Sequence, residues 1–131
     1  MATRSLLRVE VQQEVTGVVV ISCSGELDQS NCDELREAIT WSFTPDLSTL
    51  RVDLTGLTFF DSAGVKCLLE CHQSCATLGV GLEIVPSRAV ARVLDVVGFR
   101  AATEARVLPP ATATSAAADS QMVTAEEPGG D

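Results

Sequence analysis

The residues of this chain that are best placed to do chemistry lie in the polar run Asp61-Ser62-Ala63-Gly64. The run follows the apolar segment Thr58-Phe59-Phe60 and opens a helical apolar pattern, so Ser62 is predicted at or near a helix N-terminus, at the surface. One hypothesis is that Asp61 and Ser62 only cap this helix by accepting hydrogen bonds from free backbone N–H groups, a contribution of about 1 kcal/mol. The other is that the Ser62 hydroxyl accepts a phosphoryl group.

Phosphorylation of Ser62 would act through surface charge. The roughly two negative charges of a phosphate would lie beside the positive end of the helix dipole, so the domain could stay folded. They would also lie close to Asp61, and to the turn Gly25-Glu26-Leu27-Asp28 if the two turns are adjacent. A docked partner would meet repulsion and a steric block, so the interface would change while the fold stayed constant. The residues alone leave both hypotheses open.

Cys67, Cys71 and Cys75 recur at every fourth position, with the single histidine, His72, among them. Residues four apart on a helix could share a metal ion, but a tetrahedral zinc site needs about four converging ligands. These four lie on one helix, so we predict no metal site, core packing for Cys71 and Cys75, and a place at the domain surface for His72. Cys67 lies at the margin of the apolar face, which leaves a redox role for its thiol as a hypothesis.

Nucleophilic catalysis by Ser62 or Cys67 would require a base within reach. His72 points away from Cys67 and follows Ser62 by ten residues, about 15 Å of helix rise. The sequence also contains no Gly-rich phosphate loop. We therefore expect no catalytic activity and no bound cofactor.

Apolar periodicity predicts the elements that position these residues. Strands are predicted at Leu7–Val11, Val18–Ile21, Leu50–Leu54 and Gly81–Val85, with a turn at Thr16-Gly17. A first helix is expected to be capped by Asp28 or Ser30 and to carry Cys32, Leu35, Ile39 and Trp41. A second helix is expected to run from the serine turn to Leu78 and to end at Gly79. A third helix is expected after Pro86-Ser87; it ends at Gly98 and carries Val90, Val93, Leu94 and Val97. Two strands followed by strands that alternate with helices predict an α/β layer with a mixed sheet.

The second helix has one apolar and one polar face. The apolar arc comprises Val65, Leu68, Leu69, Cys71, His72 and Cys75, and the polar face comprises Lys66, Glu70, Gln73, Ser74 and Thr77. This pattern predicts a helix that lies on the sheet with one side in solvent. The strand before it is expected to carry both Phe59 and Phe60 into the core.

The composition excludes several classes of function. A chain of 131 residues with 46% hydrophobic residues suits one domain. The net charge of −9 without a basic cluster argues against nucleic acid, and apolar runs far shorter than about 20 residues argue against a membrane span. Without a signal-peptide pattern or a CxxC pair, the chain is expected to be cytoplasmic. Residues 109–131, rich in Ala, Thr, Ser and Pro and acidic, predict a disordered tail after a domain at 1–108.

An ordered series of short motifs extends beyond the serine turn. It comprises Gly25-Glu26-Leu27-Asp28, Leu57-Thr58-Phe59-Phe60, Asp61-Ser62-Ala63-Gly64, Leu68-Leu69, Leu78-Gly79, Leu82-Glu83-Ile84-Val85, Pro86-Ser87, Val90, Val93-Leu94 and Gly98-Phe99. Over about residues 7–107, this combination resembles the STAS-domain anti-sigma-factor antagonists, also called anti-anti-sigma factors. The order of the motifs is specific although each motif alone is weak.

The resemblance implies a STAS-like single domain with a mixed, mainly parallel sheet of four to five strands packed against three or more helices. It also implies that the unphosphorylated protein docks onto an anti-sigma factor and thereby releases a sigma factor for transcription. Such an anti-sigma factor is commonly a serine kinase that uses ATP and magnesium to phosphorylate the first Ser of the Asp-Ser-x-Gly turn, here Ser62. A serine phosphatase acting on phospho-Ser62 restores docking.

The resemblance also indicates a docking surface made of Asp28, Asp61, Gly64, Val65 and Lys66. Gly64 lacks a Cβ and would let a partner approach the first helical turn, and Asp28 is either a partner contact or a helix cap. Many relatives carry a second Ser where this chain has Ala63, and a Leu-Gly pair where it has Val65-Lys66. The bulkier, basic surface predicts a shifted partner specificity.

A second function is compatible with the same resemblance. Some STAS domains are subunits of signalling scaffolds or of lipid-transport complexes, in which the serine turn need not be phosphorylated. A kinase partner distinguishes the two functions.

Overall fold

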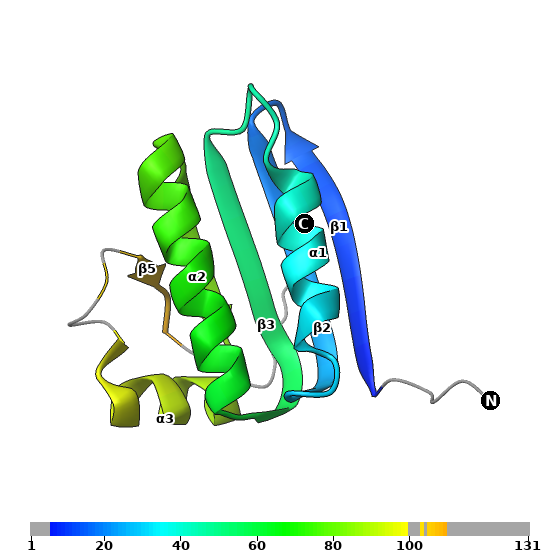
Figure 1. Ribbon diagram of the computed structural model, residues 1–131, viewed down its shortest axis with the longest axis vertical. Helices are drawn as coiled ribbons and strands as arrows, with labels where there is room; N and C mark the ends of the chain where they lie inside the picture. The colour runs from blue at the N-terminus through cyan, green and yellow to red at the C-terminus, as the bar shows by residue number, and fades with distance from the viewer. Residues whose placement is uncertain (1–5, 100–102, 104, 110–131) are drawn as a thin grey trace, which may run out of the picture.

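The computed structural model describes residues 6–99, 103 and 105–109, and Figure 1 shows how their helices and strands are arranged. The elements are β1 (Leu7–Val15), β2 (Val18–Leu27), α1 (Cys32–Ser42), β3 (Thr49–Phe60), α2 (Ser62–Leu78), β4 (Gly81–Pro86), α3 (Arg88–Val97) and β5 (Arg106–Val107). Apart from Pro109, the predicted acidic tail lies outside the described residues. No described helix is long and apolar enough to cross a membrane.

The five strands form one sheet in the order β1-β2-β3-β4-β5. The hairpin β1–β2 is antiparallel, and every other neighbouring pair is parallel. Parallel neighbours need a crossover connection, which α1, α2 and the segment containing α3 provide. The predicted α/β fold with a mixed, mainly parallel sheet is confirmed.

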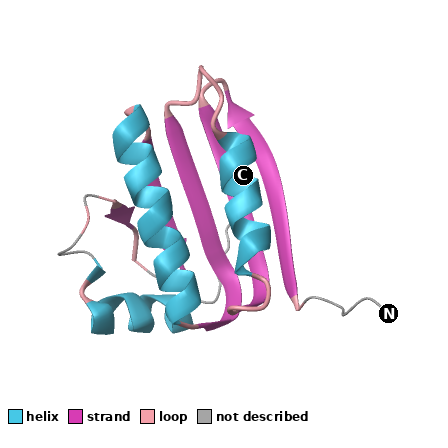
Figure 2. Ribbon diagram, in the orientation of Figure 1, coloured by secondary structure: helices cyan, strands magenta, loops and turns pink. Residues whose placement is uncertain are grey.

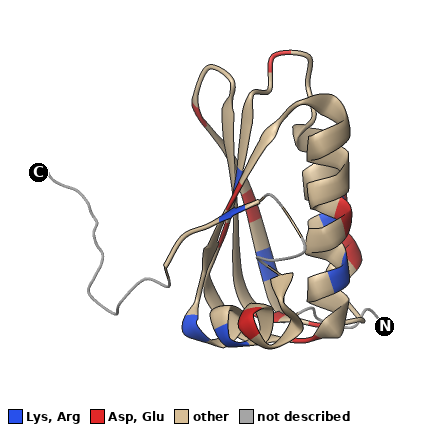
Figure 3. Ribbon diagram, turned by 90° about the vertical axis from the view of Figure 1, so that its left-hand side faces the viewer, with Lys and Arg blue, Asp and Glu red and all other residues tan. Residues whose placement is uncertain are grey.

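The core lies between the sheet and the helices that cover one of its faces. Figure 2 shows α1 and α2 side by side across the sheet, and the side view in Figure 3 shows the helical layer on one side of the strands. In the middle of the sheet, Ile21 pairs with Val52 and Val52 pairs with Ile84. All three side chains are fully buried, so this row holds three strands to one apolar layer.

Side chains alternate along each strand, so the residues between the buried ones lie on the opposite face of the sheet, where polar side chains meet. Between the buried residues of β3, Arg51 is half-buried and faces away from the core. Its guanidinium donates to Glu83 of β4 over 2.9 Å, and Glu83 also lies 3.6 Å from Arg106 of β5. These ion pairs connect β3, β4 and β5. They lie on the face of the sheet that no described helix covers.

Two aromatic side chains, those of Phe59 and Trp41, are exposed. Phe60 is buried, but Phe59 is 46% exposed, because alternation at the end of β3 places neighbouring residues on opposite sides. Trp41 is 82% exposed, since the buried stripe of α1 runs through Leu35, Ile39 and Ser42 and passes it by. The prediction that Phe59 packs in the core is therefore wrong, and Trp41, predicted on the first helix, lies on its exposed side.

Several helix ends lie where the sequence predicts them. Gly79 and Gly98 end α2 and α3 with left-handed φ values of 71° each, a conformation that glycine adopts without a Cβ penalty. Ser87 caps α3 by accepting a hydrogen bond from the Val90 N–H over 3.2 Å. These local signals set where α2 ends and where α3 begins and ends.

Candidate functional site

Two turns meet at the carboxyl edge of the sheet. In the parallel pair β2–β3, Leu27 lies opposite Phe60, and both residues end their strands. The turn that begins at Asp28 and the turn at Asp61-Ser62 therefore emerge next to each other. The adjacency on which the charge-repulsion hypothesis depends is present in the structure.

Asp61, and not Ser62, caps α2. The Asp61 carboxylate accepts hydrogen bonds from the Ala63 N–H over 3.0 Å and from the Gly64 N–H over 3.4 Å. Ser62 is the first residue of the helix and is exposed. Its hydroxyl makes no hydrogen bond within the described part of the chain, so the serine is free to meet another protein.

The two polar residues of the turn are therefore expected to differ in their effect on stability. Asp61→Ala should lower the free energy of unfolding by about 0.5–2 kcal/mol, because two backbone N–H groups lose their acceptor. Asp61→Asn keeps an acceptor oxygen and should retain most of that stability. Ser62→Ala should change it by less than about 0.5 kcal/mol. Urea denaturation measures all three, and an equal loss for Ser62→Ala would mean that the serine also caps.

The turn after β2 closes on itself. Asp28 Oδ1 accepts hydrogen bonds from the Ser30 N–H over 2.9 Å and from the Ser30 hydroxyl over 2.6 Å, and these bonds, the hydroxyl's first, hold the pKa of Asp28 below its usual value. Asn31 accepts from the Asp28 N–H over 3.0 Å and donates to the Glu26 carbonyl over 2.9 Å. This turn presents a carboxylate that stays ionised.

The capping prediction for this turn is wrong. The residue that precedes α1 is Asn31, and its side chain makes no capping hydrogen bond. The side chains of Asp28 and Ser30 are engaged with each other, so neither reaches the free N–H groups of α1. Of the two roles weighed for Asp28, the capping role is excluded, and contact with a partner stays a prediction.

A surface cavity of about 420 Å³ lies between the first turns of α1 and α2. We call it the interhelix groove. Its lining residues are Gln29, Cys32, Asp33, Arg36, Ser62, Ala63 and Lys66. The groove therefore combines the serine hydroxyl with charged side chains from both helices, and it is open to a partner at the edge where the two turns meet.

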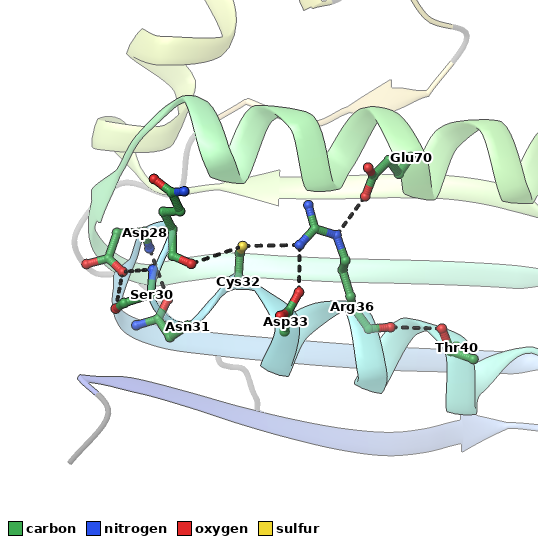
Figure 4. A network of polar contacts seen from close by, with 9 residues as sticks. Asp28, Ser30, Asn31, Cys32, Asp33, Arg36, Thr40 and Glu70 are labelled. Atoms are coloured by element: carbon green, nitrogen blue, oxygen red, sulfur yellow. Dashed lines mark hydrogen bonds and ion pairs between the residues drawn. The ribbon is translucent and has the colours of Figure 1, made fainter. Parts of the chain in front are cut away.

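Arg36 ties the two walls of the interhelix groove together, as Figure 4 shows. Its Nε donates to Glu70 of α2 over 2.7 Å, and its Nη1 donates to Asp33 over 2.8 Å and to the Cys32 sulfur over 3.2 Å. The bond to Glu70, followed by that to Asp33, raises the pKa of Arg36. The sequence did not predict this network. The spacing of Asp33 and Arg36 is compatible with an ion pair on one helix, but no local pattern indicates Glu70 as a partner.

Gly64 has a different task from the one predicted. It is buried, and a Cβ built on it would lie 2.7 Å from Cδ1 and 2.9 Å from Cζ of Phe60. The missing Cβ therefore makes room for a ring of this protein's own core. Val65 is also buried, with 9% of its surface exposed, whereas Lys66 is exposed. Of the residues predicted for the docking surface, Lys66 is the one that this helix exposes to solvent, and it lies near the exposed Ser62.

All five cysteines are free and buried. Cys67, predicted at the margin of the apolar face, is 1% exposed, and burial raises its pKa to about 12. A hydrogen bond with Cys75, together with burial, raises the pKa of Cys71 as well. The redox hypothesis for Cys67 is wrong in its premise that the thiol is accessible, because Cys67 packs against the sheet with its two neighbours on the helix.

The cysteines are expected to react slowly in the folded protein. A pKa of about 12 in place of 9.0 leaves the Cys67 thiol with roughly a thousandfold less thiolate. Native protein should therefore resist alkylation by iodoacetamide at pH 8, while protein unfolded in guanidinium should gain five alkyl groups by mass spectrometry. Rapid labelling of Cys67 in the native state would restore the redox hypothesis.

The described residues hold no group of three or more potential metal ligands. His72 is half-buried on α2. The predicted absence of a cofactor stays a prediction, and the chemistry of the site rests on one hydroxyl, one lysine and the carboxylates around them.

Comparison with protein families assigns the region that contains the site. The family model described as STAS domain matches residues 8–107 of the chain, which contain the three described helices and the five described strands except for Leu7, the first residue of β1. No relative was found among curated proteins.

Solved structures show the same fold. An anti-sigma factor antagonist from Mycobacterium paratuberculosis matches with a TM-score of 0.67 at 24% identity, over 76% of this chain and 85% of that one. The Bacillus cell fate determinant SpoIIAA in its phosphorylated form matches with a TM-score of 0.63 at 22% identity, over 81% and 93%. The murine anion transporter Slc26a9 matches with a TM-score of 0.63 at 23% identity, over 75% of this chain but only 17% of the transporter.

Proposed function

The chain belongs to the STAS domain family, and we propose that it is an anti-sigma factor antagonist that is switched off by phosphorylation of Ser62. In this proposal the unphosphorylated protein docks onto an anti-sigma factor, and the sigma factor that was held by that partner is released to start transcription. The similarity to the anti-sigma factor antagonist from Mycobacterium paratuberculosis and to the anti-sigma factor antagonist SpoIIAA supports the role.

The observation that carries the proposal is the state of the Ser62 hydroxyl. It lies exposed at the first position of α2, and the capping role is filled by Asp61. A serine that only served the helix would be expected to accept these backbone hydrogen bonds itself. The hydroxyl is instead left open to solvent, where a kinase can reach it without unfolding the domain.

The chemistry on this chain is limited to accepting and losing a phosphoryl group. A partner kinase, which holds ATP and magnesium, transfers the γ-phosphoryl group to Ser62 Oγ; the hydroxyl proton is lost and ADP leaves. A serine phosphatase then hydrolyses the ester with water, which restores the hydroxyl and releases inorganic phosphate. The chain contributes the acceptor oxygen and its position, so it acts as a substrate and not as an enzyme.

Phosphorylation ends docking through charge at the meeting point of the two turns. Asp28, Asp61 and Asp33 already place carboxylates around Ser62. A phosphate adds roughly two negative charges there, and like charges across an interface suppress binding strongly. The helix N-terminus tolerates the added anion, so the folded domain persists while its docking surface is blocked.

A second function follows from the likeness to the anion transporter, of which this chain covers only a small part. A STAS domain can serve as one subunit or domain of a larger assembly, such as a signalling scaffold or a lipid-transport complex. In that role Ser62 need not be modified. The presence of a kinase partner that modifies Ser62 separates the two functions.

The test combines binding with location of the phosphate. Purified protein is mixed with a candidate anti-sigma kinase, first without nucleotide and then with ATP and magnesium, and complex formation is followed by size-exclusion chromatography. We expect a complex that dissociates on addition of ATP, and a single phosphate on Ser62 by tandem mass spectrometry. Ser62→Ala, the matched control, should form a complex that survives ATP. A phosphate on another residue would remove the switch from the proposal.

A further inference from the structure

Lys66 is the only lysine of the chain, and it lies on the same wall of the interhelix groove as the serine. Both residues line the groove and both are exposed on α2. They are four positions apart, so one lies above the other on the helix surface. On a helix, an ion pair is more favourable when the anionic residue precedes the cationic residue by four positions than when the order is reversed.

The other cation of the groove is already engaged. Arg36 forms ion pairs with Glu70 through its Nε and with Asp33 through its Nη1. Glu70, which follows Lys66 by four residues and would otherwise suit it as a partner, is thereby occupied. Lys66 itself makes no ion pair or hydrogen bond within the part of the chain that the structure describes. It is the cation of the groove that is available to a new anion.

The backbone at the start of α2 offers little to a phosphate. The N–H groups of Ala63 and Gly64 donate to the Asp61 carboxylate, and the Val65 N–H donates to the Asp61 carbonyl over 3.2 Å. A phosphoryl group on Ser62 would thus find the N–H groups of residues 63, 64 and 65 already engaged. A cationic side chain of the groove is the group that can bring a full positive charge to it.

We propose that Lys66 is the counter-ion of phospho-Ser62 and draws the phosphoryl group into the interhelix groove. This inference rests on the proposed function, since it concerns the same modification. Before phosphorylation, the ammonium group of Lys66 is a free positive charge for an acidic side chain of the partner. After it, the phosphate fills the groove and cancels that charge, so the partner loses an ion pair as well as meeting repulsion.

The experiment installs the phosphate without any kinase. The full chain is produced with phosphoserine at position 62 by genetic code expansion, and the phosphate is titrated by ³¹P NMR. We expect the second pKa of the phosphate to rise by about 0.2–0.4 in Lys66→Gln relative to the wild type, the shift that corresponds to one helical ion pair. The other charged groups around the phosphate, namely Asp28, Asp33, Arg36, Asp61 and Glu70, are the same in both proteins.

Two matched variants isolate the pairing. Lys66→Arg keeps the charge and should keep the low phosphate pKa, whereas Arg92→Gln removes a positive charge from exposed Arg92 of α3 and should change nothing. Because Lys66 is the only lysine, ¹⁵N-lysine labelling yields a single side-chain signal, which should shift as the phosphate titrates. Equal phosphate pKa values in the wild type and Lys66→Gln, or an equal rise in Arg92→Gln, would overturn the pairing.

The design separates this inference from the proposed function. If no kinase modifies Ser62 but the pKa of the installed phosphate still rises in Lys66→Gln, the phosphorylation switch is wrong and the pairing of the phosphate with Lys66 stands. If a kinase modifies Ser62 and the phosphate pKa is the same in Lys66→Gln and the wild type, the switch stands and the pairing is wrong.

Discussion

Ser62→Glu is expected to weaken docking onto the proposed partner, an anti-sigma factor, by about 5- to 30-fold, which corresponds to roughly 1–2 kcal/mol for one added like charge at an interface. Ser62→Ala should bind within about threefold of the wild type, because the hydroxyl makes no hydrogen bond among the described residues and its loss removes little contact area. Phosphorylation should exceed the effect of glutamate, since it adds roughly twice the charge. Isothermal titration calorimetry with the partner in the absence of ATP measures all of these affinities.

The control for charge is Ser62→Gln, which has nearly the shape of glutamate without its charge. If repulsion between the added charge and acidic groups of the partner is the cause, Gln should bind much more tightly than Glu, and the penalty for Glu should shrink in high salt. Equal weakening by Gln and Glu would show that bulk at position 62 blocks the partner and that charge plays no part.

Gly64→Ala is expected to destabilise the domain. The added methyl group would overlap the buried ring of Phe60, and overpacking of this kind costs about 1–3 kcal/mol. The better helix propensity of alanine offsets up to about 1 kcal/mol of this loss, so the net effect should be a lower midpoint of urea denaturation.

A double-mutant cycle with Phe60→Leu identifies the contact. In the Phe60→Leu background the space beside residue 64 is larger, so Gly64→Ala should become neutral or stabilising there. If Gly64 served only the approach of a partner, the single variant would keep its stability and lose docking. That pattern would return the glycine to the docking surface.

Most of the fold follows from signals that act over a few residues. Alternation in Leu50–Leu54 predicts a strand with one buried face, and Gly79 and Gly98 mark helix ends because they need a left-handed backbone. The same signals place Ser62 at the start of a helix. They fail where a residue lies at the edge of a pattern, as with Phe59, whose side depends on where β3 ends.

The roles of the polar turn residues could not be read in this way. Asp61 and Ser62 have similar chemistry as caps, and which of them accepts the N–H groups depends on the angle at which β3 enters α2. Asp28 is likewise a plausible cap by its position, yet in the folded turn its oxygen bonds to Ser30.

Local patterns in the sequence predict the first four strands, the three helices and the position of an exposed serine, because backbone hydrogen bonding and the periodic burial of apolar side chains act over a few residues. The two-residue strand β5 was not predicted from such a pattern. Three contacts arise only in the folded domain: Arg36 bridges to Glu70, 34 residues away, Gly64 makes room for Phe60, and Lys66 shares a groove with Ser62. These contacts depend on how closely two helices pack on one sheet. Periodicity states which face of a helix is buried, but not which side chains of a neighbouring element it meets.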